Sequence, residues 1–207
     1  MKDFLIRLHA YISSDGLIDT WKSKDIHGRK IRIRKRFQVR FYNDNPVLIN
    51  DFIESSKRLY NGDKYIRYSE KRLEVVVRGQ IIAKSILSLG STNTRNWEIP
   101  KNIPLRQKKI WIRTFADCDG TVGHYKYYRY VAIDSINLNG LKQISYFLNK
   151  INIKNRIQKV VYNKKISYRL KISGRLNLVR YNKLIGFNHP KKQDKLNKAI
   201  NSYDGIL

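Results

Sequence analysis

Two Asp-Gly pairs, Asp15-Gly16 and Asp119-Gly120, each end an apolar stretch that predicts a helix, in FLIRLHAYISSDGLI and in IWIRTFADCDGTV. Glycine often follows the last turn of a helix in a left-handed conformation, so the two glycines alone would need no function. The aspartates fit this explanation poorly, because a carboxylate at the C-terminal end of a helix lies near the negative end of the helix dipole. We therefore expect positive charge beside both carboxylates.

Small residues stand at matching places in the two predicted helices, Ala10 with Thr114 and Ser14 with Cys118. Such residues let two helix backbones pack closely side by side, which would bring the two terminal aspartates together. Paired carboxylates are suitable ligands for Mg²⁺ or Mn²⁺, which prefer oxygen ligands and complete their shells with water and substrate phosphate. A divalent metal held there would activate water for the hydrolysis of a phosphodiester.

The composition indicates a polyanionic partner. The 207 residues include 43 Lys and Arg against 16 Asp and Glu, which gives a net charge of +27 and a pI near 10.2. Nucleic acid is the leading partner for such a chain. A membrane is not expected, because no apolar run reaches the roughly 18 to 20 residues that span a bilayer. A single cysteine and a start unlike a signal peptide favour an intracellular location, in the cytoplasm or an organelle matrix, rather than secretion.

The chain reads as two similar halves of an α+β protein, each with a helix, two strands, a helix, two strands and a further helix. The first half covers residues 1–90 and the second 105–207. Between them, 91–104 is the expected linker, within the polar, proline-containing stretch GSTNTRNWEIPKNIPL. The halves match in order but not in spacing, so the first half carries extra residues. We expect these to form a longer loop around SKDIHGRK.

Alternating strands carry the clearest physical signal. In IRIRKRFQVRFY (31–42), apolar residues share one parity and basic or polar residues the other, which predicts one buried and one exposed face. The stretches 72–78 and 166–172 repeat this pattern. The predicted buried faces comprise Ile31, Ile33, Phe37, Val39 and Phe41, then Leu73, Val75 and Val77, then Ile166, Tyr168, Leu170 and Ile172.

An antiparallel sheet with one dry face and one arginine-lined face can lie in the major groove of DNA, where Arg pairs with guanine and Gln with adenine. The alternative is a solvated strand that happens to use arginine, and it weakens because the pattern recurs in both halves. The stretch GHYKYYRYVAI (123–133) is less regular and adds a lysine and tyrosines, which either contact bases or pack as sheet aromatics. The predicted DNA-binding residues are Arg32, Arg34, Arg36, Gln38, Arg40, Arg72, Arg78, Lys126, Tyr128, Tyr130, Arg169 and Lys171.

The segments LHAYISSDG (8–16) and IRTFADCDG (112–120) resemble two copies of the nine-residue motif of the LAGLIDADG homing endonucleases, in the monomeric, two-motif form. The closing segment IGFNHPKKQDKLNKAI (185–200) is similar to that of many members. The resemblance implies a pseudo-two-fold repeat of αββαββα halves. The two motif helices would form the central interface, and two saddle-shaped antiparallel sheets would straddle a long double-stranded DNA target.

The resemblance also implies an activity and its ligands. The family cuts both strands of a specific site across the minor groove and leaves short 3′ overhangs. Asp15 and Asp119 would bind the divalent metals, helped by the carbonyl oxygens of Ser14 and Cys118.

This chain departs from the family pattern at several motif positions. His9, Ser13 and Arg113 are more polar than usual, and Thr114 replaces a glycine or alanine, so we expect a looser helix interface.

Other catalytic positions are assigned through the resemblance. A glutamine often ends the second strand of each half, where this chain has Asn43 and Ser135. A basic residue usually stands near the reacting phosphate. Lys191 or Lys192 is the candidate in the second half, and Lys101 is a candidate for its counterpart.

Other interpretations stay open. An RNA maturase, or a DNA-binding protein on the same scaffold, would bind without cutting, and a basic ribosomal RNA-binding protein is a weaker alternative. Both acids favour the nuclease, because a protein that only binds has no reason to keep two awkward carboxylates. No intein-like nucleophile begins the chain, which favours a free-standing, intron-encoded protein, and two motifs make a monomer sufficient. His27, His124 and His189 share no spacing and are expected to be surface or packing residues.

Overall fold

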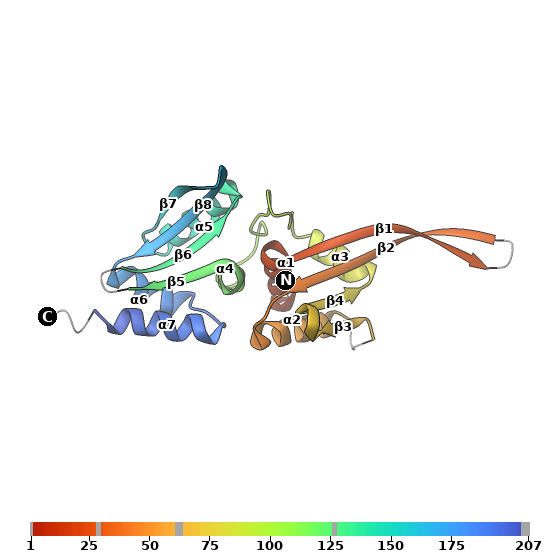
Figure 1. Cartoon of the computed structure of the whole chain (residues 1–207), viewed down its shortest axis with the longest axis horizontal. Coiled ribbons are helices and arrows are strands. Elements are labelled where there is room, and N and C mark those ends of the chain that lie inside the picture. Colours follow the sequence, from red (N-terminus) through yellow and green to blue (C-terminus); the bar gives the residue numbers. More distant parts are fainter. Residues whose placement is uncertain (1, 28–29, 61–63, 126–127, 204–207) are drawn as a thin grey trace.

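The computed structural model describes residues 2–27, 30–60, 64–125 and 128–203, which form two α+β halves (Figure 1). The first half contains α1 (Asp3–Asp15), β1 (Gly16–His27), β2 (Lys30–Tyr42), α2 (Pro46–Tyr60), β3 (Ile66–Ser69), the 3-10 turn η1 (Glu70–Arg72), β4 (Glu74–Arg78) and α3 (Gln80–Leu87). The second contains α4 (Leu105–Asp119), β5 (Gly120–His124), β6 (Arg129–Ser135), α5 (Leu138–Lys150), β7 (Arg156–Tyr162), β8 (Lys165–Ser173), α6 (Arg175–Leu184) and α7 (Pro190–Asn201). The predicted αββαββα order is confirmed in both halves, and α7 follows the second.

Each half has a four-stranded antiparallel sheet, in the order β1-β2-β4-β3 and β5-β6-β8-β7. The registers match: Gly16 pairs with Phe41, and Gly120 pairs with Ile133. The residue after each motif helix therefore pairs with the equivalent residue of the second strand in its half. One face of each sheet packs on its helices, and alternate side chains point to the other face.

The extra residues of the first half lengthen a hairpin, so the prediction of a longer loop is wrong. β1 and β2 stay paired from Gly16 with Phe41 out to His27 with Lys30. This hairpin protrudes far from the rest of the half (Figure 1). The alternation of residue types continues along it, because strand pairing needs no core beneath it.

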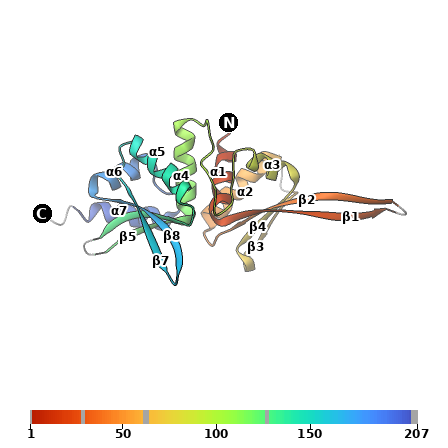
Figure 2. The same cartoon turned by 90° about the horizontal axis from the view of Figure 1, so that it is seen from above.

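Several residues predicted to face inward are exposed. Ile31 and Ile33 are 66% and 62% exposed, because the protruding part of the hairpin lies beyond the helices that cover the sheet (Figure 2). Leu73 has a φ of +50° after the η1 turn and is also exposed, and Ile166 lies near the tip of the β7–β8 hairpin. The other inward residues are buried or half-buried, as predicted.

Two hydrophobic clusters form the core, one in each half. The second cluster also contains Trp97, Ile99 and Ile103, so the segment between the halves packs into it. Ile6 and Ala10 of α1 belong to this cluster as well, which joins the first helix to the second half. Among the described residues, no helix is long and apolar enough to cross a bilayer.

The two motif helices, α1 and α4, pack against each other at the centre of the molecule (Figure 2). Nε1 of Trp111 donates a 3.0 Å hydrogen bond to Nδ1 of His9, and both side chains are fully buried. The Ser13 hydroxyl donates to the carbonyl oxygen of His9 at 2.8 Å. Of the polar side chains that we expected to loosen this interface, His9 is therefore hydrogen-bonded across it and Ser13 within α1.

Candidate active site and nucleic-acid interface

The two motif helices end at Asp15 and Asp119, and each is followed directly by a strand. Gly16 and Gly120 are extended, with φ of −137° and −88°, so the predicted left-handed caps are wrong. Space explains the glycines instead. A Cβ on Gly16 would lie 2.5 Å from Ile12 Cδ1, and one on Gly120 would lie 2.3 Å from the carbonyl oxygen of Ala116.

The two aspartates are half-buried and electrostatically coupled. Burial raises the pKa of Asp119 to about 7, and the negative charge of Asp15 contributes to the shift. Burial also raises the pKa of Asp15. The two helices pack against each other and end at these residues, and the charge of Asp15 acts on Asp119, which favours a short separation. The predicted pairing of the helix ends is consistent with these shifts.

The chemistry of these groups suits a hard divalent cation that is shared with a substrate. Among the described residues, no group of three or more His, Cys, Asp or Glu side chains could hold a metal alone. Mg²⁺ is commonly held by one or two carboxylates plus substrate phosphate oxygens, so the pair Asp15 and Asp119 fits it. The Cys118 carbonyl oxygen, a predicted ligand, accepts a hydrogen bond from Lys192 at 2.9 Å. The carbonyl oxygen of Ser14, the other predicted ligand, stays a prediction.

Lys192 supplies the positive charge expected at the helix ends. Its Nζ donates to the carbonyl oxygens of Ala116, Asp117 and Cys118, at 3.3, 2.6 and 2.9 Å. Its charge lowers the pKa of both Asp15 and Asp119, against the effect of burial. Burial in turn lowers the pKa of Lys192.

Asp117 forms a second connection between α4 and the residues that lead into α7. Its Oδ1 accepts hydrogen bonds from the backbone N–H groups of Asn188 and His189, at 2.8 and 3.0 Å, at the start of α7. The last turn of α4 and the first turn of α7 therefore cap each other. Sequence reasoning missed Asp117, although it stands in the motif itself. Its only signal was a second carboxylate two residues before Asp119.

The other candidate lysines are placed differently. Lys191 is exposed, and its charge contributes to lowering the pKa of His189. Lys101 has a side chain that is 80% exposed and pairs with Glu98 at 3.6 Å. Of the candidates, Lys192 is the one that the structure brings to the aspartates.

The residues that end the second strands differ between the halves. Asn43 Nδ2 donates a 3.0 Å hydrogen bond to Asp15 Oδ2. Ser135 Oγ instead accepts hydrogen bonds from Trp97 Nε1 at 3.2 Å and from the backbone N–H of Asn137 at 3.1 Å. Asn43 thus contacts a candidate metal ligand, whereas the two contacts of Ser135 hold the end of its strand.

His189 lies at the boundary between the halves. Its Nε2 is 3.2 Å from Nδ2 of Asn45 in the first half, and the ring is half-buried. His124 is part-exposed, as expected for a surface or packing residue.

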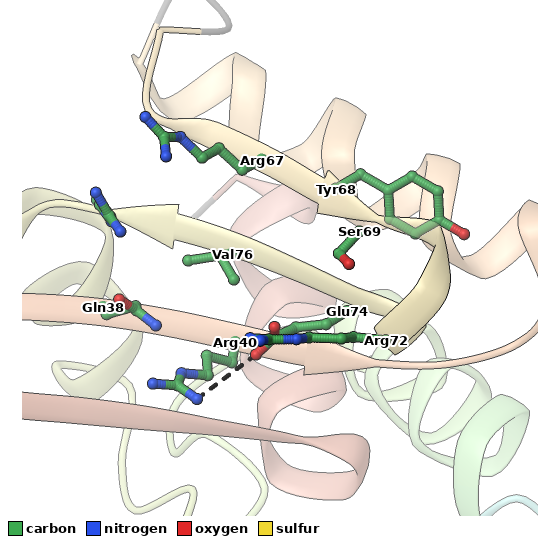
Figure 3. A pocket seen from close by; sticks show the side chains of 9 residues that line it. Gln38, Arg40, Arg67, Tyr68, Ser69, Arg72, Glu74 and Val76 are labelled. Atoms are coloured by element: carbon green, nitrogen blue, oxygen red, sulfur yellow. Dashed lines mark ion pairs between the residues drawn. The ribbon is translucent and has the colours of Figure 1, made fainter.

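A hollow of about 400 Å³ lies on the face of the first sheet opposite the core (Figure 3). Arg40 belongs to an ion-pair network there, with Asp19 at 3.0 Å and Glu74 at 3.6 Å. Gln38, predicted to contact DNA, is on this face but only 8% exposed. The residues that line the hollow are Gln38, Arg40, Arg67, Tyr68, Ser69, Arg72, Glu74, Val76 and Arg78. Arg67 was missed because β3 is short and shows no clear alternation.

The protruding hairpin carries the remaining predicted residues of this sheet. Asp25 pairs with Arg34 at 3.1 Å and with Arg36 at 2.9 Å. Arg32 lies further out on the hairpin and is exposed.

The second sheet presents a similar face. Lys171 Nζ lies 4.4 Å from the centre of the Tyr130 ring and 6.0 Å from that of Tyr128, which is 66% exposed. Arg169 forms two hydrogen bonds to Asp134, at 2.7 and 3.0 Å. Lys126, also predicted to bind DNA, lies outside the described residues.

Comparison with known proteins agrees with this architecture. Residues 106–186 match the family model of the LAGLIDADG-like domain. The chain is 25% identical over 187 residues to homing endonuclease I-ApeI of Aeropyrum pernix, covering 84% of this chain and 82% of that protein.

Two solved structures show the same fold. The structure of I-DmoI in complex with DNA and Ca superposes with a TM-score of 0.65 at 18% identity, over 95% of this chain and 97% of that one. The meganuclease I-SmaMI, bound to uncleaveable DNA, superposes with a TM-score of 0.59 at 13% identity, over 99% of this chain and 91% of that one.

Proposed function

We propose that this chain, a two-motif LAGLIDADG protein by sequence and fold, is a site-specific endonuclease that cuts both strands of DNA with the help of a divalent metal. The observation that carries the proposal is the half-buried pair Asp15 and Asp119, on which the charge of Lys192 acts. A protein that only binds nucleic acid gains nothing from two half-buried carboxylates at this place. The relatives include a homing endonuclease and a homing endonuclease bound to DNA.

The residues at the helix ends have three separate roles in the proposed hydrolysis: metal binding, orientation of a carboxylate and charge stabilisation. Asp15 and Asp119 would hold Mg²⁺ or Mn²⁺, which when bound lowers the pKa of water and stabilises the charge that develops on the leaving 3′ oxygen. Asn43 fixes the orientation of the Asp15 carboxylate through its 3.0 Å hydrogen bond. The charge of Lys192 acts on both carboxylates. Its three N–H donors are engaged by carbonyl oxygens, so it would stabilise negative charge on the reacting phosphate through its electrostatic field rather than by a hydrogen bond.

The sheet faces hold the duplex on either side of this centre. The arginines of the first sheet and the lysine and tyrosines of the second lie on the faces that the helices leave open. With the chain charge of +27, these faces attract the phosphate backbone and position the scissile bonds at the helix ends. Cleavage on both strands across the minor groove would leave short 3′ overhangs.

The test is a selection of cleaved duplexes from a randomised DNA library in Mg²⁺, with Ca²⁺ as the non-cleaving comparison. We expect one recurrent site and 3′ overhangs at the cut ends. Asp15→Asn and Asp119→Asn should each abolish cutting while leaving binding to the selected duplex within a few fold. Loss of binding together with retained nicking would contradict the proposal, as would random cutting by the wild type.

A further inference from the structure

The arginines on the first sheet differ in whether a carboxylate holds them. Arg40 lies between two acids, with its Nε 3.0 Å from Asp19 Oδ2 and its Nη1 3.6 Å from Glu74 Oε1. Arg67 and Arg72 line the same hollow, and within the described part of the chain no carboxylate pairs with either (Figure 3). One surface thus presents both a fixed guanidinium and free ones.

The second sheet also has an arginine paired with an acid across two neighbouring strands. In the first sheet the arginine is on β2 and Glu74 on β4, whereas in the second the acid is on β6 and the arginine on β8. Arg169 of β8 is the register partner of Asp134 on β6. Arg169 occupies the place that Glu74 has on β4, because each stands one residue before the buried leucine or valine of its strand, Leu170 or Val75.

The contacts of Arg169 leave three of its five N–H groups available. Nε and Nη2 donate to Asp134 at 2.7 and 3.0 Å. An arginine has five N–H donors, so both N–H groups of Nη1 and one of Nη2 remain. These form the planar fork that matches O6 and N7 of guanine in the major groove.

Acids on this surface oppose simple attraction to DNA. The chain has only 16 Asp and Glu against 43 Lys and Arg, yet Asp19, Glu74 and Asp134 each lie beside an arginine on a sheet face. The pairs of Asp19 with Arg40 and of Asp134 with Arg169 are partly exposed, and such pairs contribute little to folding stability. A role in stability therefore explains the positions of Asp19 and Asp134 poorly, and the buried Glu74 pairs with the same Arg40 as Asp19.

Holding an arginine changes which part of DNA it can bind. A phosphate accepts hydrogen bonds from many directions, so a mobile cation binds it well, and release of counterions drives the contact. A base edge needs two donors at a fixed place and in a fixed plane, so an arginine already immobilised loses less entropy on binding it. The neighbouring carboxylate also cancels the charge that would attract phosphate.

We propose that Asp19, Glu74 and Asp134 are specificity-determining residues, which hold Arg40 and Arg169 so that each arginine reads a guanine rather than a phosphate. The inference rests on the proposed site-specific cleavage of DNA and deepens it. Arg67 and Arg72 are then the phosphate-binding residues of the first-sheet hollow.

The test compares arginine-to-lysine changes at a held and a free position. Wild type, Arg40→Lys and the matched control Arg72→Lys are each used to select bound duplexes from a randomised library in Ca²⁺. Lysine keeps the charge but loses the fork. We expect Arg40→Lys to lose discrimination at one base pair by about 5- to 150-fold while its affinity for random DNA is unchanged. Arg72→Lys should keep the wild-type preference at every position.

Removing the acids gives an independent readout. Glu74→Gln and Asp19→Asn should bind random DNA more tightly, with the slope of log Kd against log salt steeper by about 0.9, because the freed arginine gains a phosphate. Thermal unfolding checks the fold, and if Glu74→Gln does not fold, the more exposed Asp19→Asn decides the question.

Two outcomes separate the inference from the proposed function. If the wild type selects a site and Arg40→Lys keeps its full preference, the inference is overturned while the endonuclease proposal stands. If the wild type selects no site at all, the proposed function fails and the inference falls with it.

Discussion

Nε1 of Trp111 donates a 3.0 Å hydrogen bond to Nδ1 of His9 across the central helix pair. The imidazole must be neutral at Nδ1 to accept this bond, and burial lowers the pKa of His9 to about 4. This contact ties the stability of the interface to pH.

We expect the free energy of unfolding to fall as the pH drops from about 6.5 to 4. The folded-state pKa of His9 lies below the unfolded value of 6.5, so in this window the unfolded chain binds more protons. The loss attributable to His9 approaches roughly 3 kcal/mol. Urea unfolding of wild type and His9→Gln at several pH values measures it, because glutamine can accept the bond without titrating. His124→Gln, at a part-exposed position, is the control, and a pH-independent difference between wild type and His9→Gln would contradict the prediction.

Asp119→Asn should stabilise the protein at pH 8 in EDTA. The folded-state pKa of Asp119, about 7, lies above its ordinary value of 3.8, so above pH 7 the folded chain must bury a charged carboxylate. The gain should reach roughly 3 to 4 kcal/mol and disappear as the pH falls towards 4, where the acid is protonated in both states. Thermal or urea unfolding tests this, with Asp194→Asn on the exposed face of α7 as the control. Greater wild-type stability at pH 8 would exclude an uncompensated charge.

Lys192→Met should lower the rate of cleavage by about 10² to 10³ while DNA binding in Ca²⁺ changes little. The reason is the loss of the cation that acts on both Asp15 and Asp119. Single-turnover kinetics separate the two effects. Lys191→Met removes the same charge one residue away, at an exposed position, and should cut at the wild-type rate. Equal defects in the two variants would show that only total charge matters.

Shortening the β1–β2 hairpin should shorten the DNA footprint on one side only. The part beyond Phe37 contributes no buried residue to the core among those described, so its removal should leave thermal stability nearly unchanged. A variant with a tight turn joining Trp21 to Arg36, which are register partners, makes the change. Nuclease protection on the selected duplex measures it, and a symmetrical loss of protection would contradict an asymmetric arm.

The sequence was sufficient to predict what depends on local pattern. Repetition and alternation predicted the halves, the strands and the inward parity of Val39 and Phe41. Parity does not say where the covering helices end, so Ile31 and Ile33 were wrongly expected to be buried. Alternation was visible in the hairpin, but the length mismatch between the halves suggested a loop.

The assembly of the site depends on contacts between distant residues. The capping of α7 by Asp117 joins positions 71 apart in the chain, and no local pattern marks it. Lys192 was one of two adjacent candidates, and only its contact with the end of α4 distinguishes it from Lys191. The family resemblance supplied the segment, and tertiary contacts selected the residue.

The mutual capping of α4 and α7 has a consequence for the origin of the chain. A symmetric dimer made from two copies of the first half would hold Asp15 and Asn43 twice but would lack Lys192 and its helix. A dimer of the second half would crowd two copies of Asp119 and Asp134 around the axis, without the amide of Asn43. The halves have become complementary rather than equivalent, so neither can be exchanged for a duplicate of the other.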